Sequence, residues 1–146
     1  MPASKECFSL KSDSMRCRIL IADDDSAVRE QVRQIVESRE GFKVCGEAAD
    51  GAEAIERTKQ LKPDLVILDI SMPGVDGFEA ARIIRKFFPD VRILMFSVHK
   101  SNELKKHAME VGAAGYVEKS EGEQLLKAIE TVLRDGHYYG STAAFA

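Results

Sequence analysis

Short runs of apolar residues recur along the chain, and a polar residue follows almost every one. They occupy residues 18–22, 42–46, 64–68, 91–96 and 114–118, and the run at 42–46 is the weakest. Short runs rich in Val, Ile and Leu are typical of strands that are buried on both faces of a parallel sheet. The pattern therefore predicts five buried strands.

Amphipathic helices are predicted after each of these runs. Apolar residues recur there at spacings of three and four, which is the period of a helix with one buried face. The predicted helical faces occupy residues 28–36, 51–61, 78–88, 104–111 and 125–133. Strict alternation of strands and helices at this spacing means right-handed crossovers, so we expect an α/β fold with a parallel sheet covered on both faces.

Capping motifs mark the start of three of these helices. In each, a side chain that accepts a hydrogen bond stands three residues before a glutamate. The pairs are Asp50 with Glu53, Asp76 with Glu79, and Ser120 with Glu123. Gly41 and Gly112 follow the first and fourth helices, where glycine often ends a helix.

The composition is that of one ordinary globular domain. The chain has 146 residues, of which 45% are hydrophobic and 31% charged, so it can bury one sizeable core. Its net charge of −3 lacks the basic excess of a nucleic-acid binder, and we expect no binding of nucleic acid by this domain alone. Because no apolar run approaches the roughly 20 residues of a membrane span, we expect no membrane segment.

The termini and the cysteines add little chemistry. Cys7, Cys17 and Cys45 are too scattered for a disulfide framework or a metal site, which favours reduced thiols and a cytoplasmic protein. We expect a polar tail at residues 1–17, the domain at 18–136, and a C-terminal tail or the start of a linker at 137–146.

The candidate chemistry lies at the ends of the predicted strands. The polar residues at these ends are Asp23, Asp24, Asp25, Asp69, Ser97 and Lys119. The carboxyl ends of parallel strands share one edge of the sheet, which is where ligands bind in such folds. Crowded carboxylates beside a phosphate suit Mg²⁺, and an aspartate can attack phosphorus. Each residue alone fits a capping, turn or solvated role, but their coincidence predicts one phosphoryl-transfer site.

At these positions the chain resembles the receiver domains of bacterial two-component response regulators. The resemblance is carried by Asp23-Asp24, by Leu65 to Gly77 with Asp69 and Met72-Pro73 inside it, by Phe96-Ser97, and by Gly115-Tyr116 to Lys119. It covers nearly all of residues 18–135. It implies a flavodoxin-like fold with five parallel strands in the order 2-1-3-4-5.

The resemblance also implies a role for each residue of the site. Asp69 accepts the phosphoryl group, and Lys119 pairs with it. Asp24 binds Mg²⁺ directly, Asp23 acts mainly through water, and the backbone carbonyl of Ser71 completes the protein ligands. The implied donor is a sensor histidine kinase or a histidine phosphotransfer protein, and the implied domain is a signalling module and not an enzyme.

A switch is implied by Ser97 and Tyr116. The hydroxyl of Ser97 would turn towards the phosphoryl group, and Tyr116 would then swing inward. The surface expected to bind an output partner or a second copy of the chain comprises the helix after Ser97, the fifth strand and the helix after Ser120. Ser71 and His99 stand where the family tunes hydrolysis, although both fit equally well as exposed loop residues.

Several alternatives bear on this interpretation. A pseudo-receiver that only binds partners should have lost Asp69 or Lys119, and both are present. A haloacid-dehalogenase-type phosphatase needs a second aspartate where Ser71 stands. A flavodoxin-like redox protein needs a hydroxyl-rich phosphate loop after its first strand, where this chain has the three acidic residues Asp23 to Asp25.

Ser120 replaces the usual proline after Lys119. Together with the ending 135–139, it makes the chain resemble receivers of the NarL type, which precede helix-turn-helix domains.

Overall fold

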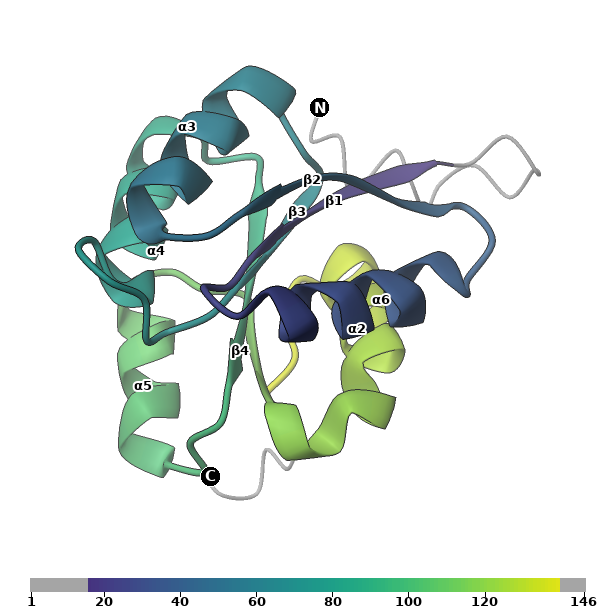
Figure 1. The fold of residues 1–146 in the computed structure, drawn as a ribbon. Coiled ribbons are helices and arrows are strands. Elements are labelled where there is room, and N and C mark those ends of the chain that lie inside the picture. Colours follow the sequence, from purple (N-terminus) through teal and green to yellow (C-terminus); the bar gives the residue numbers. More distant parts are fainter. Residues whose placement is uncertain (1–15, 140–146) are drawn as a thin grey trace.

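A five-stranded parallel sheet lies between two layers of helices in the computed structural model, which describes residues 16–139 (Figure 1). The elements in chain order are β1 (Cys17–Ala22), α2 (Ser26–Glu37), β2 (Phe42–Ala48), α3 (Gly51–Leu61), β3 (Leu65–Leu68), α4 (Gly77–Phe87), β4 (Arg92–Ser97), α5 (Asn102–Glu110), β5 (Gly115–Glu118), the 3-10 helix η1 (Lys119–Gln124) and α6 (Leu125–Asp135). The predicted alternation of strands and helices is confirmed.

The strand order is β2-β1-β3-β4-β5, and every neighbouring pair is parallel. This confirms the predicted flavodoxin-like order. The chain leaves β1 towards one edge of the sheet and later crosses back to β3 on the other side of β1. The carboxyl ends of β1 and β3 therefore form the point where the strand order reverses, which is the usual place for a ligand.

Two hydrophobic cores flank the sheet. Helices α3, α4 and α5 cover one face and α2 and α6 cover the other (Figure 1). Adjacent strand residues point to opposite faces, so Leu20 belongs to the first core and its neighbour Ile19 to the second, and both are fully buried. Burial on both faces explains why the strands appear in the sequence as continuous apolar runs and not as alternating ones.

Two of the three predicted capping motifs are confirmed. Asp50 accepts a hydrogen bond from the Glu53 amide at 2.8 Å, and Asp76 accepts one from the Glu79 amide at 2.9 Å.

The predicted capping pair of Ser120 and Glu123 is wrong. Residues Lys119–Gln124 form a 3-10 turn, and α6 begins at Leu125 without a side-chain cap. The side chain of Lys119 is held by carboxylates at the carboxyl edge of the sheet. The chain must therefore turn within a few residues of the strand, and the tighter 3-10 spacing serves as the connector.

The ends of the described region pack on the domain. The first strand begins at Cys17, one residue before its predicted start. Tyr138 forms a bridge with Gly115, and the hydroxyl of the buried Tyr139 donates to the Ala113 carbonyl at 2.6 Å. These two tyrosines, which the sequence places beyond the domain, thus extend it. The rest of the expected tails, residues 1–15 and 140–146, lies outside the described residues.

Candidate functional site

Side chains from three strand ends meet at the carboxyl edge of the sheet. Ala22 at the end of β1 pairs with Leu68 at the end of β3, so Asp23 and Asp69 leave adjacent strands side by side. Carboxylate oxygens of Asp23, Asp24 and Asp69 all lie within 4.8 Å of one another. Lys119, directly after β5, reaches the carboxylates of Asp23 and Asp69.

The three consecutive aspartates after β1 do different things. Asp25 caps α2, because its side chain accepts hydrogen bonds from the Ala27 and Val28 amides. Asp24 is exposed, and its carboxylate is available to solvent. Asp23 is only 2% exposed, and its Oδ1 accepts the Asp25 amide at 2.9 Å. The capping role that fits all three in the sequence therefore belongs to Asp25, and the other two contribute oxygens to the cluster.

Lys119 is the cation that faces these carboxylates. Its Nζ lies 2.7 Å from Asp23 Oδ2 and 3.3 Å from Asp69 Oδ1. Burial lowers the pKa of Lys119, but the hydrogen bond to Asp23 and the charges of Asp69 and Asp23 outweigh it and raise the pKa above its ordinary value. Three carboxylates against one ammonium leave a negative site, and such a set of oxygens fits a divalent cation such as Mg²⁺.

Asp69 is a buried carboxyl group with an altered pKa. Burial raises its pKa, and so does the neighbouring charge of Asp23. Lys119 and a hydrogen bond from the Ser71 backbone lower it, but the net shift is upward. The ionised form of a carboxyl group is the one that can act as a nucleophile, and Lys119 favours that form of Asp69.

The backbone of Asp69 is fixed by a close approach of Gly77. A Cβ atom at Gly77 would lie 2.1 Å from the Asp69 carbonyl oxygen and 2.7 Å from the Ile70 Cα. The Gly77 amide also donates to the Ile70 carbonyl at 2.8 Å. Only glycine allows the start of α4 to pack this tightly against the loop that carries Asp69.

Ser97 and Tyr116 meet through the loop after β4. Ser97 is 1% exposed, and its Oγ accepts the His99 amide at 3.0 Å. The Tyr116 hydroxyl donates to the His99 carbonyl at 2.7 Å. Burial raises the pKa of Tyr116, whereas a hydrogen bond with Ser97 acts in the opposite direction. Tyr116 is itself 1% exposed, so its ring is buried in this structure.

Two further candidates lie at the rim of the site. The side chains of Ser71 and His99 are both exposed, which fits either a role in water access or an ordinary loop position. Ser71 touches the site through its backbone, which hydrogen-bonds the Asp69 carboxylate.

The sequence analysis missed two residues that support the site. Arg29 on α2 donates to the Asp23 backbone carbonyl at 2.6 Å, and its Nε donates to Glu47 Oε1 at 2.8 Å. Glu47 is the one acidic residue in β2, and an acidic side chain in a strand was the available signal. Its partner was not evident, because the pairing depends on how α2 lies across β2.

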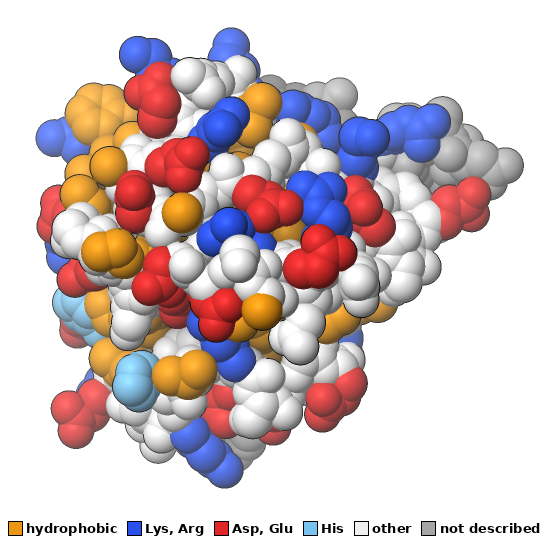
Figure 2. Space-filling model, in the orientation of Figure 1, with side chains coloured by type: hydrophobic (Ala, Val, Ile, Leu, Met, Phe, Trp, Pro, Cys, Tyr) orange, Lys and Arg blue, Asp and Glu red, His pale blue; other side chains and the backbone are white. Residues whose placement is uncertain are grey.

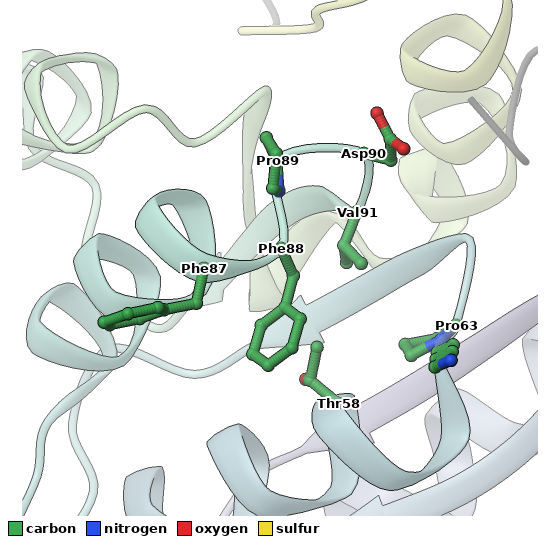
Figure 3. Close-up of a pocket in the computed structure, with 8 residues that line it drawn as sticks. Thr58, Pro63, Phe87, Phe88, Pro89, Asp90 and Val91 are labelled. Atoms are coloured by element: carbon green, nitrogen blue, oxygen red, sulfur yellow. The ribbon is translucent and has the colours of Figure 1, made fainter. Parts of the chain in front are cut away.

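A separate apolar pocket lies at the opposite edge of the sheet. It has a volume of about 340 Å³ and lies between the end of α3 and the loop that joins α4 to β4. Phe88 points towards Thr58 across it, whereas Phe87 points away (Figure 3). None of the predicted site residues lines this pocket, so it is not part of the acidic cluster.

The surface carries charges of both signs. On the face shown in Figure 2, acidic and basic side chains are interspersed and do not gather by sign. Within residues 16–139, none of the helices combines the length and the apolar character that crossing a membrane requires.

Comparison with known proteins gives one consistent family. Residues 19–130 match the family model of the response regulator receiver domain. The chain is 39% identical to the response regulator UvrY of Escherichia coli (strain K12) over 127 residues, which make up 86% of this chain and 58% of UvrY. It thus spans little more than half the length of the curated relatives that it matches.

Solved structures agree with this assignment. The chain superimposes on a LuxR-family two-component response regulator from Aurantimonas sp. SI85-9A1 with a TM-score of 0.82 and 40% identity, covering 88% of this chain and 91% of that one. A chain from the CheX–CheY–BeF3–Mg²⁺ complex of Borrelia burgdorferi is 32% identical, with a TM-score of 0.77 and coverage of 82% and 92%. The family-model match at residues 19–130 includes Asp23, Asp24, Asp69 and Lys119.

Proposed function

Since the chain belongs to the response regulator receiver domain family of two-component systems, we propose that it is switched by phosphorylation of Asp69. The observation that carries this proposal is the group formed by Asp23, Asp24, Asp69 and Lys119 at the point where the strand order reverses. Asp69 is the buried carboxylate of the cluster that leaves β3 and contacts the lysine.

The proposed reaction transfers a phosphoryl group from a phosphohistidine to Asp69. An Asp69 carboxylate oxygen attacks phosphorus, a P–O bond forms, the P–N bond of the donor breaks, and the imidazole leaves with the bonding electrons and takes up a proton. Mg²⁺ would be held by Asp23, Asp24, Asp69 and the Ser71 backbone carbonyl, and would offset the repulsion between two anions. Lys119 would bind the new phosphoryl oxygens. Water later hydrolyses the acyl phosphate.

The proposed donor is a sensor histidine kinase or a histidine phosphotransfer protein in the cytoplasm. The domain would itself be a reactant in signalling, and turnover of a small molecule would not be its function. The proposed output surface comprises α5, β5 and α6, and would bind a partner or a second copy of the chain. Its link to the site would run from Ser97 through His99 to Tyr116, which two hydrogen bonds connect.

The alternative of a pseudo-receiver is less well supported. A module that only binds partners has no need to keep a nucleophile and a cation together. Here Asp69 and Lys119 are both present, and their charged atoms lie 3.3 Å apart. The CheX–CheY complex, with its BeF3 and Mg²⁺, provides a precedent for testing this chain with a phosphoryl analogue.

The test is phosphorylation by acetyl phosphate with Mg²⁺, followed by intact-protein mass spectrometry. We expect the wild type to gain one phosphoryl group and Asp69→Asn to gain none. Asp76→Asn is the matched control, because Asp76 caps α4 in the next loop and asparagine caps a helix equally well. Phosphorylation of Asp69→Asn at the wild-type rate would show that the assignment is wrong.

A further inference from the structure

A charged network on α2 and β2 reaches the backbone of the acidic loop. Arg29 donates through Nη1 to the Asp23 carbonyl at 2.6 Å and through Nε to Glu47 Oε1 at 2.8 Å. Arg33, one turn later on α2, donates to Glu47 Oε2 at 2.7 and 3.0 Å. Glu47 thus holds two arginines, and Arg29 is the one that also binds the loop.

Asp23 is fixed at every polar atom that it has. Its amide donates to the Ala48 carbonyl at 3.0 Å, and its carboxylate oxygens accept from the Asp25 amide and from Lys119. Arg29 supplies the remaining contact, at the carbonyl oxygen. This last contact is the one that sets the direction of the next peptide, because the carbonyl of Asp23 and the amide of Asp24 belong to the same planar group.

The exposed Asp24 is the residue most affected by that direction. Asp23 is buried and held by its own side chain, whereas Asp24 is exposed. The plane of the Asp23–Asp24 peptide therefore determines where the Asp24 Cα lies, and so the point from which its carboxylate can reach towards Asp69. Glu47 stays charged as the anchor of Arg29. Burial raises its pKa, but the hydrogen bonds from Arg33 and Arg29 outweigh this and lower the pKa overall.

We propose that Arg29, anchored by Glu47, is a positioning residue that orients the Asp23–Asp24 peptide and thereby presents the Asp24 carboxylate to a divalent cation. This inference rests on the proposed Mg²⁺ site. Arg29 touches neither the cation nor the phosphoryl group. It acts through the backbone carbonyl of Asp23, in the way that outer contacts orient the ligands of many metal sites.

The test compares Arg29→Met with Arg33→Met. Both variants lose one positive charge from α2 and one partner of Glu47, but only the first removes the hydrogen bond from Arg29 to the Asp23 carbonyl. Mg²⁺ affinity is measured by calorimetric titration and by the amide chemical shift of Asp24. We expect Arg29→Met to weaken Mg²⁺ binding about tenfold, in line with the loss of outer contacts at other metal sites, and Arg33→Met to change it less than twofold.

A role in positioning also predicts that Arg29 affects the Mg²⁺ dependence of phosphorylation and not its maximal rate. Arg29→Met should need more Mg²⁺ to reach half its maximal phosphorylation rate with acetyl phosphate, while its rate at saturating Mg²⁺ should stay near that of the wild type. Arg29→Lys should recover part of the affinity, because it keeps the charge and one donor. Should Arg29→Met fold poorly by circular dichroism, Glu47→Gln serves instead, since it keeps the shape of the anchor and removes its charge.

The outcomes separate this inference from the proposed function. If the wild type fails to bind Mg²⁺, or if Asp24→Asn binds it as well as the wild type, the proposed metal site itself is wrong. If those two results are as expected but Arg29→Met and Arg33→Met bind Mg²⁺ equally well, only the positioning role is overturned. Weaker Mg²⁺ binding by Arg29→Met than by Arg33→Met, together with a wild-type phosphorylation rate at saturating Mg²⁺, supports the positioning role.

Discussion

Replacing Lys119 by methionine tests whether this lysine offsets the crowding of carboxylates. Its Nζ lies 2.7 Å from Asp23 and 3.3 Å from Asp69, and the three side chains are 15%, 3% and 7% exposed. At an effective dielectric constant of about 20, these separations correspond to attractions of about 6 and about 5 kcal/mol. Dehydration of the ammonium offsets several kcal/mol of that attraction. Methionine keeps the apolar stem and removes only the charge.

We expect Lys119→Met to lower the free energy of unfolding by about 3 kcal/mol, the low end of the range for breaking a buried ion pair. The low end applies because Asp23 keeps the Asp25 amide and Asp69 keeps the Ser71 backbone as partners. Asp69 can also take up a proton. The variant should remain folded, which makes the loss measurable by urea unfolding without added Mg²⁺.

The loss should depend on pH in a defined direction. Lys119 lowers the pKa of Asp69, so its removal raises that pKa further above the ordinary value. Between the ordinary pKa and this raised one the folded state binds more protons than the unfolded state, and stability falls as pH rises. The effect of Lys119→Met should therefore be smaller at about pH 5 than at about pH 8.

A double-mutant cycle identifies the partner. In an Asp69→Asn background one of the two carboxylates is neutral, so we expect the cost of Lys119→Met to fall by about 1–2 kcal/mol. The same cost in both backgrounds and at both pH values would refute the reasoning, because Lys119 would then stabilise the fold through its stem and not through its charge.

Two further predictions concern the loops around the site. Gly77→Ala should lower the free energy of unfolding by about 1–3 kcal/mol and weaken Mg²⁺ binding, because the new Cβ atom would collide with the Asp69 backbone. Gly122→Ala is the control, since the nearest neighbour of its Cβ atom would be Ile35 Cδ1 at 3.8 Å. Tyr116→Phe should lower the free energy of unfolding by about 1 kcal/mol through loss of the hydrogen bond to the His99 carbonyl, and should reduce beryllofluoride-induced changes in amide exchange across α5. Beryllofluoride-induced changes equal to those of the wild type would count against the proposed link.

The positions of the site residues along the chain were predictable because the strands are parallel. Each apolar run ends at the same edge of the sheet, so Asp23, Asp69 and Lys119 could be placed together from the run ends alone. The rule needs no knowledge of side-chain packing, only the direction and the order of the strands. It therefore located the acidic cluster but gave no information on what holds it in place.

The supporting contacts were not predictable, because they depend on register. The pairing of β1 with β2 shifts between Val44 and Gly46, so that Cys45 is passed over and Glu47 lies opposite Ile21. A shift of one residue turns a strand side chain to the other face of the sheet. Whether Glu47 meets Arg29 or points away from it is therefore decided by this irregularity, which the apolar pattern of a weak strand does not reveal.

The burial and the charged surroundings of Asp69, the proposed phosphoacceptor, destabilise the fold. Burial and the charge of Asp23 raise the pKa of Asp69, so the folded state disfavours its ionised form relative to the unfolded state. The Asp69→Asn parent of the cycle should for this reason be more stable than the wild type at about pH 8, although we expect it to accept no phosphoryl group. The difference should shrink as pH falls through the raised pKa of Asp69, since the wild-type carboxyl is then neutral as well. A lower urea midpoint for Asp69→Asn at about pH 8 would mean that Lys119 compensates the charge of Asp69 completely.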